Sequence, residues 1–403
     1  ILGDRESDAS RFPAPVVRRD HPGDLDGELN ASQAEAVGRA RDCHPCHLIW
    51  GPPGTGKTKV IPRIISGVDG PVLLGAFTNT AVDKMLLSLL DHDPSTRFLR
   101  MGRAADSPEL ARRLEDPSEY FSDDLAEKLR SVTAVRDALG SARIVAATAH
   151  RAATLPYLRL RPFEMAIVDE AGQLTEPLTL GLILRGRRFV LIGDDLQLPP
   201  VVRTRALGSS MFERLKRERP ESVTLLDTQY RMHPGIMTLA NRLFYGDRLR
   251  SQVAPDDRTP PEGPPVTLIP VEGEPEDRRN LAEAEAVAAR VRSYIRDYGV
   301  PAARIGVVSP FRAQVALMRQ MLEDTGVTVD TVERFQGGER DVMMLSFVRS
   351  SFSGFVLDPR RFNVAITRAR RKLILVAHPK LFRDSPYEWI YTYTEVSKTA
   401  GAI

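Results

Sequence analysis

At 403 residues, with 42% hydrophobic and 27% charged residues, the chain is longer than one typical domain and predicts two or three domains with ordinary cores. Its 56 Lys and Arg residues against 53 Asp and Glu give a formal charge of +3, which excludes a globally basic protein and requires any polyanionic partner to be held by a local charged stripe. No run of about 18 apolar residues and no signal-peptide core is present, so we expect a soluble, intracellular protein without a membrane span.

The first chemical pattern along the chain is Cys43-His44-Pro45-Cys46-His47. It formally matches haem attachment and also offers metal ligands in a short span. The run leads directly into the next expected strand, where a haem would obstruct a nucleotide site, and no export signal accompanies it. We therefore interpret it as a coincidence at a strand edge.

A phosphate-binding loop is indicated between an apolar run at 47–50 and a helical stretch. Its backbone N–H groups can surround the β- and γ-phosphates, Lys57 supplies charge, and Thr58 supplies a hydroxyl ligand for Mg²⁺. Pro62 follows inside the helical stretch, where we expect a shortened or kinked helix. The loop consists of Gly51, Pro52, Pro53, Gly54, Thr55, Gly56, Lys57 and Thr58.

Apolar runs alternate with helical patterns along the chain, which predicts two doubly wound α/β domains with parallel sheets and crossover helices. We expect an N-terminal extension at 1–28, a first domain at 29–221 with a helical insertion at about 91–141, a second domain at 222–385 and a tail at 386–403. The stretch 251–275 is interpreted as a loop of the second domain. The expected strands are 72–77, 144–148, 165–168 and 189–192 in the first domain, and 223–226, 305–309, 342–347 and 373–377 in the second.

Acidic and amide side chains follow two expected strands of the first domain. Asp169 and Glu170 come directly after an apolar run, where the first can hold Mg²⁺ through water and the second can orient or deprotonate an attacking water. Gln197 lies in a Gly/Asp/Pro turn after the next run, within reach of a γ-phosphate. A helix cap and a tight turn are the structural alternatives for these two motifs.

Two arginines in the second domain complete the chemistry if the domains face each other. Arg231 lies in Gln229–Pro234 and Arg368 in Asn363–Arg370. Planar, permanently charged donors suit the charge that develops on a transferred phosphoryl group. Structural ion pairing is the alternative for either arginine alone.

Six motifs in this order resemble the superfamily 1 helicases, in the Upf-like branch that moves 5′ to 3′, over about residues 29–379. They are 51–58, 169–173, 193–200, 229–234, 335–339 and 363–370. Within the branch, the runs at 188–200, 206–212 and 345–350 are most similar to the motor of nuclease-helicases that trim replication flaps. The resemblance implies two tandem RecA-like domains that hydrolyse ATP with Mg²⁺ in their cleft.

The resemblance also implies roles for individual residues. Gln33 would contact adenine, Tyr230 the base and Glu339 the ribose, with Gln197 as γ-phosphate sensor and Arg231 and Arg368 as arginine fingers. Hydroxyl, amide and backbone groups would hold the phosphates of a single strand without reading bases. These nucleic-acid contacts are expected at Thr78, Asn79, Thr80, Thr148, His150, Pro310, Phe311, Gln314 and Thr331.

Three positions depart from the family pattern: Gly172, Asp195 and Gly338. The 28 residues before Leu29 leave no room for a nuclease domain, and two cysteines cannot hold a four-cysteine iron–sulfur cluster, so we expect a motor whose nuclease, if any, lies outside this chain.

We therefore expect a monomeric, ATP-dependent DNA helicase or translocase acting on single-stranded DNA in replication or repair. An RNA helicase of the same branch and a regulatory ATPase module without unwinding are the alternatives.

Overall fold

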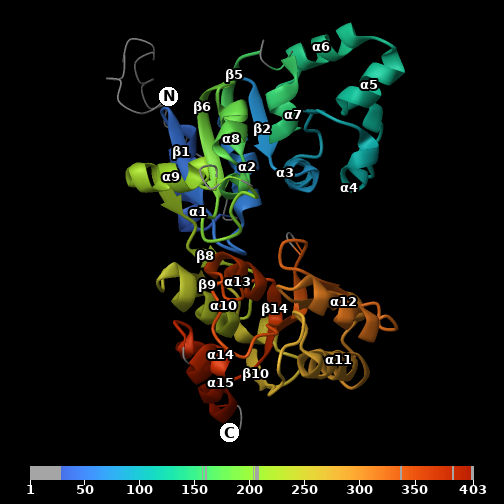
Figure 1. The fold of residues 1–403 in the computed structure, drawn as a ribbon. Helices are drawn as coiled ribbons and strands as arrows, with labels where there is room; N and C mark the ends of the chain where they lie inside the picture. Colours follow the sequence, from blue (N-terminus) through green and yellow to red (C-terminus); the bar gives the residue numbers. More distant parts are fainter. Residues whose placement is uncertain are drawn as a thin grey trace.

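The computed structural model describes residues 29–400 except 157, 159–160, 203, 205–207, 336–337 and 384. The N-terminal extension expected at 1–28 lies outside the described residues. Figure 1 shows two α/β halves, the first coloured blue to green and the second yellow to red. The chain crosses between them next to β8 (Thr228–Gln229).

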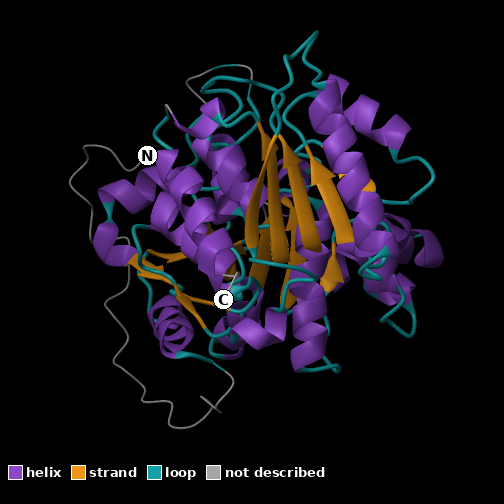
Figure 2. Ribbon diagram, turned by 90° about the horizontal axis from the view of Figure 1, so that it is seen from below, coloured by secondary structure: helices purple, strands orange, loops and turns teal. Residues whose placement is uncertain are grey.

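The first half is built on a seven-stranded sheet in the order β3-β4-β2-β5-β6-β1-β7, in which every pair is parallel. Strands β1 and β2 are buried on both faces because helices cover both sides of the sheet (Figure 2). The strands are β1 (Cys46–Trp50), β2 (Val72–Ala76), β3 (Leu99–Arg100), β4 (Ile144–Thr148), β5 (Phe163–Val168), β6 (Gly186–Gly193) and β7 (Val223–Leu225).

The helices of the first half fall into crossovers and an insertion. Of the region 91–141, expected to be helical, part is strand: β3 pairs with β4 at the sheet edge. The rest contains α4 (Pro108–Ala111), α5 (Ser122–Leu129) and α6 (Val132–Ser141), beside the crossover helices in Figure 1. The other helices are α1 (Ala31–Arg41), α2 (Lys57–Ser66), α3 (Asn79–His92), α7 (Ala149–Thr154), α8 (Glu176–Ile183) and α9 (Met211–Glu218).

Helix α2 runs through Pro62 without interruption, so the expected shortening is wrong. A proline at this position cannot donate to the Thr58 carbonyl four residues earlier. The Ser88 hydroxyl on α3 donates to that carbonyl instead, at 3.0 Å. A neighbouring helix thus satisfies the acceptor that Pro62 leaves without its backbone donor.

The second half contains a five-stranded parallel sheet in the order β10-β14-β13-β11-β12. Strand β10 (Val266–Pro270) lies in the stretch 251–275 that we expected to be a loop, because flanking prolines and glycines hide its short apolar pattern. The remaining strands are β11 (Ile305–Val308), β12 (Thr328–Asp330), β13 (Arg340–Ser346) and β14 (Ala369–Ala377).

Three longer helices pack with this sheet: α11 (Leu281–Arg296), α12 (Arg312–Met321) and α13 (Pro359–Ile366). Helix α10 (Pro234–Ala240) continues into a π-turn at Asn241–Tyr245. After β14 come α14 (Lys380–Arg383) and α15 (Glu388–Ala400), of which α15 packs against β10, so the segment expected as a tail is largely helical.

One expected strand belongs to the other sheet. Strand β7 pairs with β1, with Leu48 opposite Val223, and therefore extends the first sheet past the expected boundary at residue 221. A short apolar run does not reveal its partner strand, which the tertiary structure decides. After β7, β8 and β9 (Arg250–Ser251) form a separate two-stranded ribbon.

Candidate nucleotide site between two halves

The phosphate loop joins the end of β1 to α2, as its sequence predicts. Gly54 has a φ of 76°, and a Cβ there would lie 2.6 Å from the Arg231 Cβ, so both conformation and space require glycine. The Tyr230 N–H donates to the Gly54 carbonyl at 2.8 Å. The loop is thus in direct contact with the segment that carries Arg231.

The side chain of the loop lysine folds back onto the backbone of the loop. The Lys57 Nζ donates to the Gly51 carbonyl at 2.7 Å and lines a cavity of about 580 Å³. This volume falls within the range typical of small-molecule sites. Every residue of the loop from Pro53 to Thr58 borders this cavity.

Both carboxylates after β5 face the same cavity. Burial, and next the Glu170 charge, raise the pKa of Asp169 to about 7. Glu170 has a φ of 52°, a left-handed conformation that is uncommon for a non-glycine residue and is often found at functional sites. Its Oε2 accepts from the Gln173 amide at 2.9 Å, which fixes the direction of the carboxylate.

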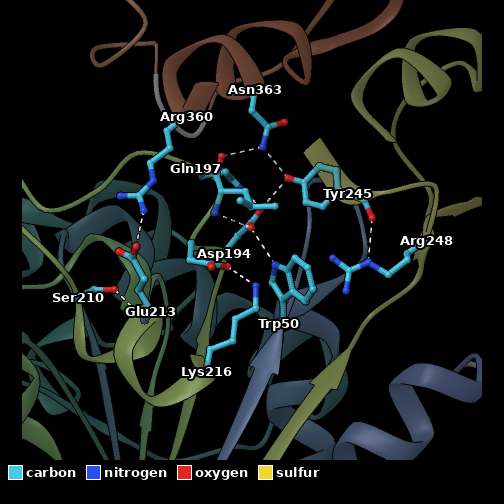
Figure 3. A network of polar contacts seen from close by, with 12 residues as sticks. Trp50, Asp194, Gln197, Ser210, Glu213, Lys216, Tyr245, Arg248, Arg360 and Asn363 are labelled. Carbon is cyan, nitrogen blue, oxygen red and sulfur yellow. Dashed lines mark hydrogen bonds and ion pairs between the residues drawn. The ribbon is translucent and has the colours of Figure 1, made fainter. Parts of the chain in front are cut away.

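Gln197 lies in the loop after β6, where Figure 3 shows its polar contacts, and it also borders the cavity. Its Nε2 donates to the Asp194 carboxylate at 2.8 Å. Asp194 also accepts from the Trp50 indole and the Tyr245 hydroxyl. The tight turn considered for this sequence exists, and it carries a side chain into the cavity.

The second half contributes both predicted arginines. Arg231 forms an ion pair with Glu339, which also lies 3.8 Å from Arg370. Arg368 is 7% exposed, and among the described residues none bonds its Nε. Burial, and next the Arg231 charge, lower the pKa of Arg368 to about 10. A buried cation facing a cavity in this way favours an anionic ligand.

Two residues expected to contact the nucleotide differ in their position relative to the cavity. Tyr230 is half-exposed, borders the cavity, and its hydroxyl accepts from the Asn30 amide at 2.8 Å. Gln33 is 1% exposed and does not border the cavity. Its Nε2 donates to the Thr55 carbonyl at 3.0 Å and its Oε1 accepts from the Asn30 N–H, so it braces the phosphate loop. In this structure the cap of α1 and the phosphate loop use the Gln33 amide, and its contact with adenine stays a prediction.

A second cavity of about 600 Å³ lies beside the first, and Phe77 and Thr78 border both. Four of the expected nucleic-acid contacts line it, whereas Thr80 borders the nucleotide cavity. The four are Thr78, Asn79, Thr148 and His150, and they are joined by Arg100, Arg103 and Arg151.

Most of the expected contacts in the second half are buried. Phe311 and Thr331 are each 8% exposed, while Pro310 is half-buried. Gln314 is fully buried, its Oε1 accepts from the Asn280 N–H, and its Nε2 donates to the Asn280 carbonyl and Ser346 hydroxyl. In this structure the Gln314 amide joins α12 to α11 and β13, and its contact with nucleic acid stays a prediction.

The departures from the family pattern have structural settings. A Cβ at Gly172 would lie 2.9 Å from the Asp194 carbonyl oxygen, so glycine allows two loops to approach closely. Asp195 pairs with Lys216 at 2.5 Å. At Gly338 the space for a Cβ is ordinary, and nothing in the structure explains the glycine.

Several residues of the site were missed by sequence reasoning. Arg370 is the last residue of the motif at 363–370, so its charge and position could have predicted a place in the site. Glu333 and Arg334 border the cavity from the turn after β12, and Lys84 from α3, without a pattern that marks them. Tyr245 and Asn363 take part in the Asp194 network only through the tertiary structure.

The comparisons with known proteins agree with this arrangement. A family model described as an AAA domain matches residues 207–380, and another with the same description matches 28–118 and 106–205. The DNA replication ATP-dependent helicase/nuclease JHS1 of Arabidopsis thaliana is 33% identical over 396 residues, covering 89% of this chain. The DNA replication ATP-dependent helicase/nuclease DNA2 of Gallus gallus is 33% identical over 379 residues, also covering 89%.

The two family models between them match residues 28–205 and 207–380, and the chain is similar to these ATP-dependent helicases along most of its length. Its two parallel sheets with their covering helices are tandem RecA-like domains. The chain spans 29% of the Arabidopsis relative and 37% of the Gallus relative. An uncharacterized ATP-dependent helicase of Methanocaldococcus jannaschii is 29% identical, with 94% of this chain and 71% of that protein aligned.

In the part of the chain that the structure describes, no helix is long and apolar enough to cross a bilayer.

Proposed function

We propose that this helicase chain is an ATP-dependent motor that moves 5′ to 3′ along single-stranded DNA in replication or repair. One observation carries the proposal: the phosphate loop of the first half and the arginines of the second border a single cavity. A triphosphate bound there would touch both halves, so its hydrolysis could change their relative position.

In this proposal the chain holds ATP through complementary charge. The loop N–H groups and Lys57 bind the β- and γ-phosphates, and Tyr230 and Glu339 border the base and ribose side. Arg231 and Arg368 stabilise the charge that develops on the γ-phosphoryl group. Glu170 orients the attacking water, and Gln197 contacts the γ-phosphate.

The residues present also fit Mg²⁺. The hydroxyl of Thr58 and the carboxylate of Asp169 are oxygen donors on the same cavity, as Mg²⁺ requires. Across the described residues no group of three or more His, Cys, Asp or Glu could hold a metal, which suits an ion shared with substrate phosphates. When bound, Mg²⁺ would neutralise charge on the β- and γ-phosphates.

The second cavity supports the choice of a nucleic-acid strand as the track. It combines Thr78 and Thr148, which cap α3 and α7, with arginines, a donor set that suits a phosphate backbone. The relatives named for DNA replication favour DNA over RNA, and the Upf-like motifs favour the 5′ to 3′ direction. Since one chain supplies both walls of the nucleotide cavity, we infer that the motor works as a monomer.

The decisive measurement is ATP turnover with and without a single-stranded DNA oligonucleotide. We expect severalfold stimulation by DNA. We expect Lys57→Ala to lower turnover by about 100-fold or more, because it removes the positive charge that stabilises the transferred phosphoryl group. A matched RNA oligonucleotide that stimulates more strongly would favour an RNA helicase. Unchanged turnover with either strand would contradict a translocase.

Direction is tested with partial duplexes. We expect displacement of a duplex that carries a 5′ overhang and none from a 3′ overhang. Equal failure on both substrates, with ATP turnover intact, would support the regulatory ATPase.

A further inference from the structure

A buried carboxylate, that of Asp194, joins three parts of the molecule (Figure 3). Asp194 is 4% exposed, and its Oδ2 accepts from the Gln197 amide at 2.8 Å and the Tyr245 hydroxyl at 2.7 Å. Its Oδ1 accepts from the Trp50 indole at 2.9 Å and the Leu196 N–H at 3.1 Å. It therefore ties the strand before the phosphate loop to the loop of Gln197 and to the second half.

The chain of hydrogen bonds continues from Tyr245 into α13. The Asn363 Nδ2 donates to the Tyr245 hydroxyl at 2.7 Å and to the Leu196 carbonyl at 2.8 Å. Both of its amide hydrogens are thus used, and the reversed amide would place Oδ1 against the carbonyl oxygen of Leu196. The polarity of the chain is fixed: Asn363 donates to Tyr245, and Tyr245 donates to Asp194.

Helix α13 leads directly to a proposed arginine finger. The Thr367 hydroxyl, at the end of this helix, donates to the Asn363 carbonyl at 2.7 Å, and Arg368 follows. A shift of α13 relative to the loop of Gln197 would break both Asn363 bonds together. Because the atoms are buried, no solvent is at hand to replace those bonds.

We propose that Tyr245 is a positioning residue that couples the loop of Gln197 to α13, so that Gln197 and Arg368 reach the γ-phosphate together. The proposal rests on the proposed function, because it assumes that both groups act on one nucleotide. Nothing in the sequence motifs assigns a role to Tyr245. Burial and the nearby Asp194 carboxylate raise the pKa of Tyr245, so its hydroxyl keeps the proton that it donates.

The chain offers a matched control for removing this hydroxyl. Tyr294 on α11 is also fully buried and also donates to a carboxylate, that of Glu262, at 2.8 Å. It does not border the nucleotide cavity. Tyr245→Phe and Tyr294→Phe therefore each remove a hydroxyl that a buried tyrosine donates to a carboxylate, and their thermal midpoints measure the structural loss at each site.

With single-stranded DNA and saturating ATP, we expect Tyr245→Phe to lower kcat by about tenfold, since misplacing catalytic groups raises the barrier of the chemical step. KM for ATP should stay within about twofold of the unchanged chain, because the phosphate loop is intact. Tyr294→Phe should leave both constants within about twofold. Equal kcat in the two variants would overturn the coupling role.

A second readout does not depend on turnover. Trp50 and Trp389 are the two tryptophans of the chain, so Trp389→Phe leaves Trp50 as the fluorescent reporter inside the network. A non-hydrolysable ATP analogue should change its emission in this background and with Tyr294→Phe added. Adding Tyr245→Phe instead should at least halve that change, and an undiminished change would contradict the proposal.

These readouts separate the two proposals. If DNA fails to stimulate the unchanged chain, the translocase function fails, while the Trp50 measurement still decides on the coupling. If Tyr245→Phe does not fold, Asn363→Asp serves in its place. It keeps the volume but sets an acceptor against the Leu196 carbonyl, and it should show the same loss of kcat and emission change.

Discussion

Arg368 is a residue whose buried charge lowers the stability of the fold and at the same time suits an anionic ligand. It is buried beside Arg231, and no described residue bonds its Nε. A buried cation without a full set of partners is destabilising, and it persists where a ligand supplies the missing charge. Glu170 is another energetically unfavourable residue on the same cavity, because its backbone has a left-handed conformation.

We expect Arg368→Met to lower ATP turnover by about 10³-fold, the magnitude typical of an arginine finger. The thermal midpoint should stay unchanged or rise, because the substitution removes a poorly partnered buried charge and keeps the apolar stem. Turnover assays and thermal unfolding check both effects. Arg292→Ala, which removes a surface ion pair with Asp324 at 3.0 Å, is the control and should leave turnover unchanged. A midpoint lower than that of the control would contradict the account.

At the scale of elements, side chains replace backbone hydrogen bonds that the elements themselves cannot make. Pro62 lies inside α2, and Ser88 of α3 donates to the Thr58 carbonyl. At the end of β13, Val348 has a φ of 72°, which is unfavourable for a β-branched residue. The Glu283 carboxylate on α11 accepts from the Val348 N–H at 2.9 Å and from the Ser346 hydroxyl at 2.7 Å.

A double-mutant cycle tests the junction of α2 and α3. Ser88→Ala should lower the free energy of unfolding by about 1 kcal/mol, because it leaves the Thr58 carbonyl without its donor. In a Pro62→Ala background the loss should be less than half as large, since the alanine N–H can donate to the same carbonyl. Denaturant unfolding of the four chains gives the coupling. Equal losses in both backgrounds would show that Ser88 does not compensate for Pro62.

Glu283 gives a pH prediction. Burial raises its pKa to about 7 from the ordinary 4.5, so the folded state binds a proton more tightly than the unfolded state. Stability should therefore be highest below about pH 4.5 and decline as pH rises to about 7, by on the order of 3 kcal/mol from this group. Glu283→Gln should flatten that decline. Unfolding of both chains across pH 5 to 8 is the measurement, and parallel curves would exclude the contribution.

At the scale of the whole molecule, charge is local. The chain carries only +3 overall, yet Arg100, Arg103 and Arg151 gather on one cavity of the first half. Arg100 is buried and pairs with Asp83 at 3.1 Å, and Arg151 pairs with Asp123 at 2.5 Å. Arg103 is exposed, with Glu127 at 3.6 Å, and is the best placed of the three to reach a phosphate.

We expect Arg103→Ala to weaken single-stranded DNA binding and to reduce the slope of log K against log salt by about 0.7, as for one lost phosphate contact. Arg97→Ala is the control: Arg97 is also an exposed arginine of the inserted segment, but it does not border the cavity. Fluorescence anisotropy at several salt concentrations gives both slopes. An equal change in the two variants would indicate a non-specific effect of charge.

Most of the local structure and of the chemistry of the first half follows from residue order alone. Near-continuous apolar runs predict buried parallel strands, and the phosphate loop, Asp169 and Glu170 follow such runs directly. Neighbours along the chain fix their relation, so their meeting on one cavity follows from the carboxyl ends of parallel strands lying at one edge of a sheet.

Features that depend on partners far apart in the chain became known from the three-dimensional structure. Strand β7 pairs with β1 and so belongs to the first sheet. Gln33 and Gln314 are buried and bond to backbone groups. Tyr245 donates to Asp194, and Asn363 donates to Tyr245. An amide bonds equally well to a nucleotide or to a backbone group, so residue type cannot distinguish the two roles. Long-range packing selects the partner, and it therefore decides which polar side chains face a ligand and which hold the fold.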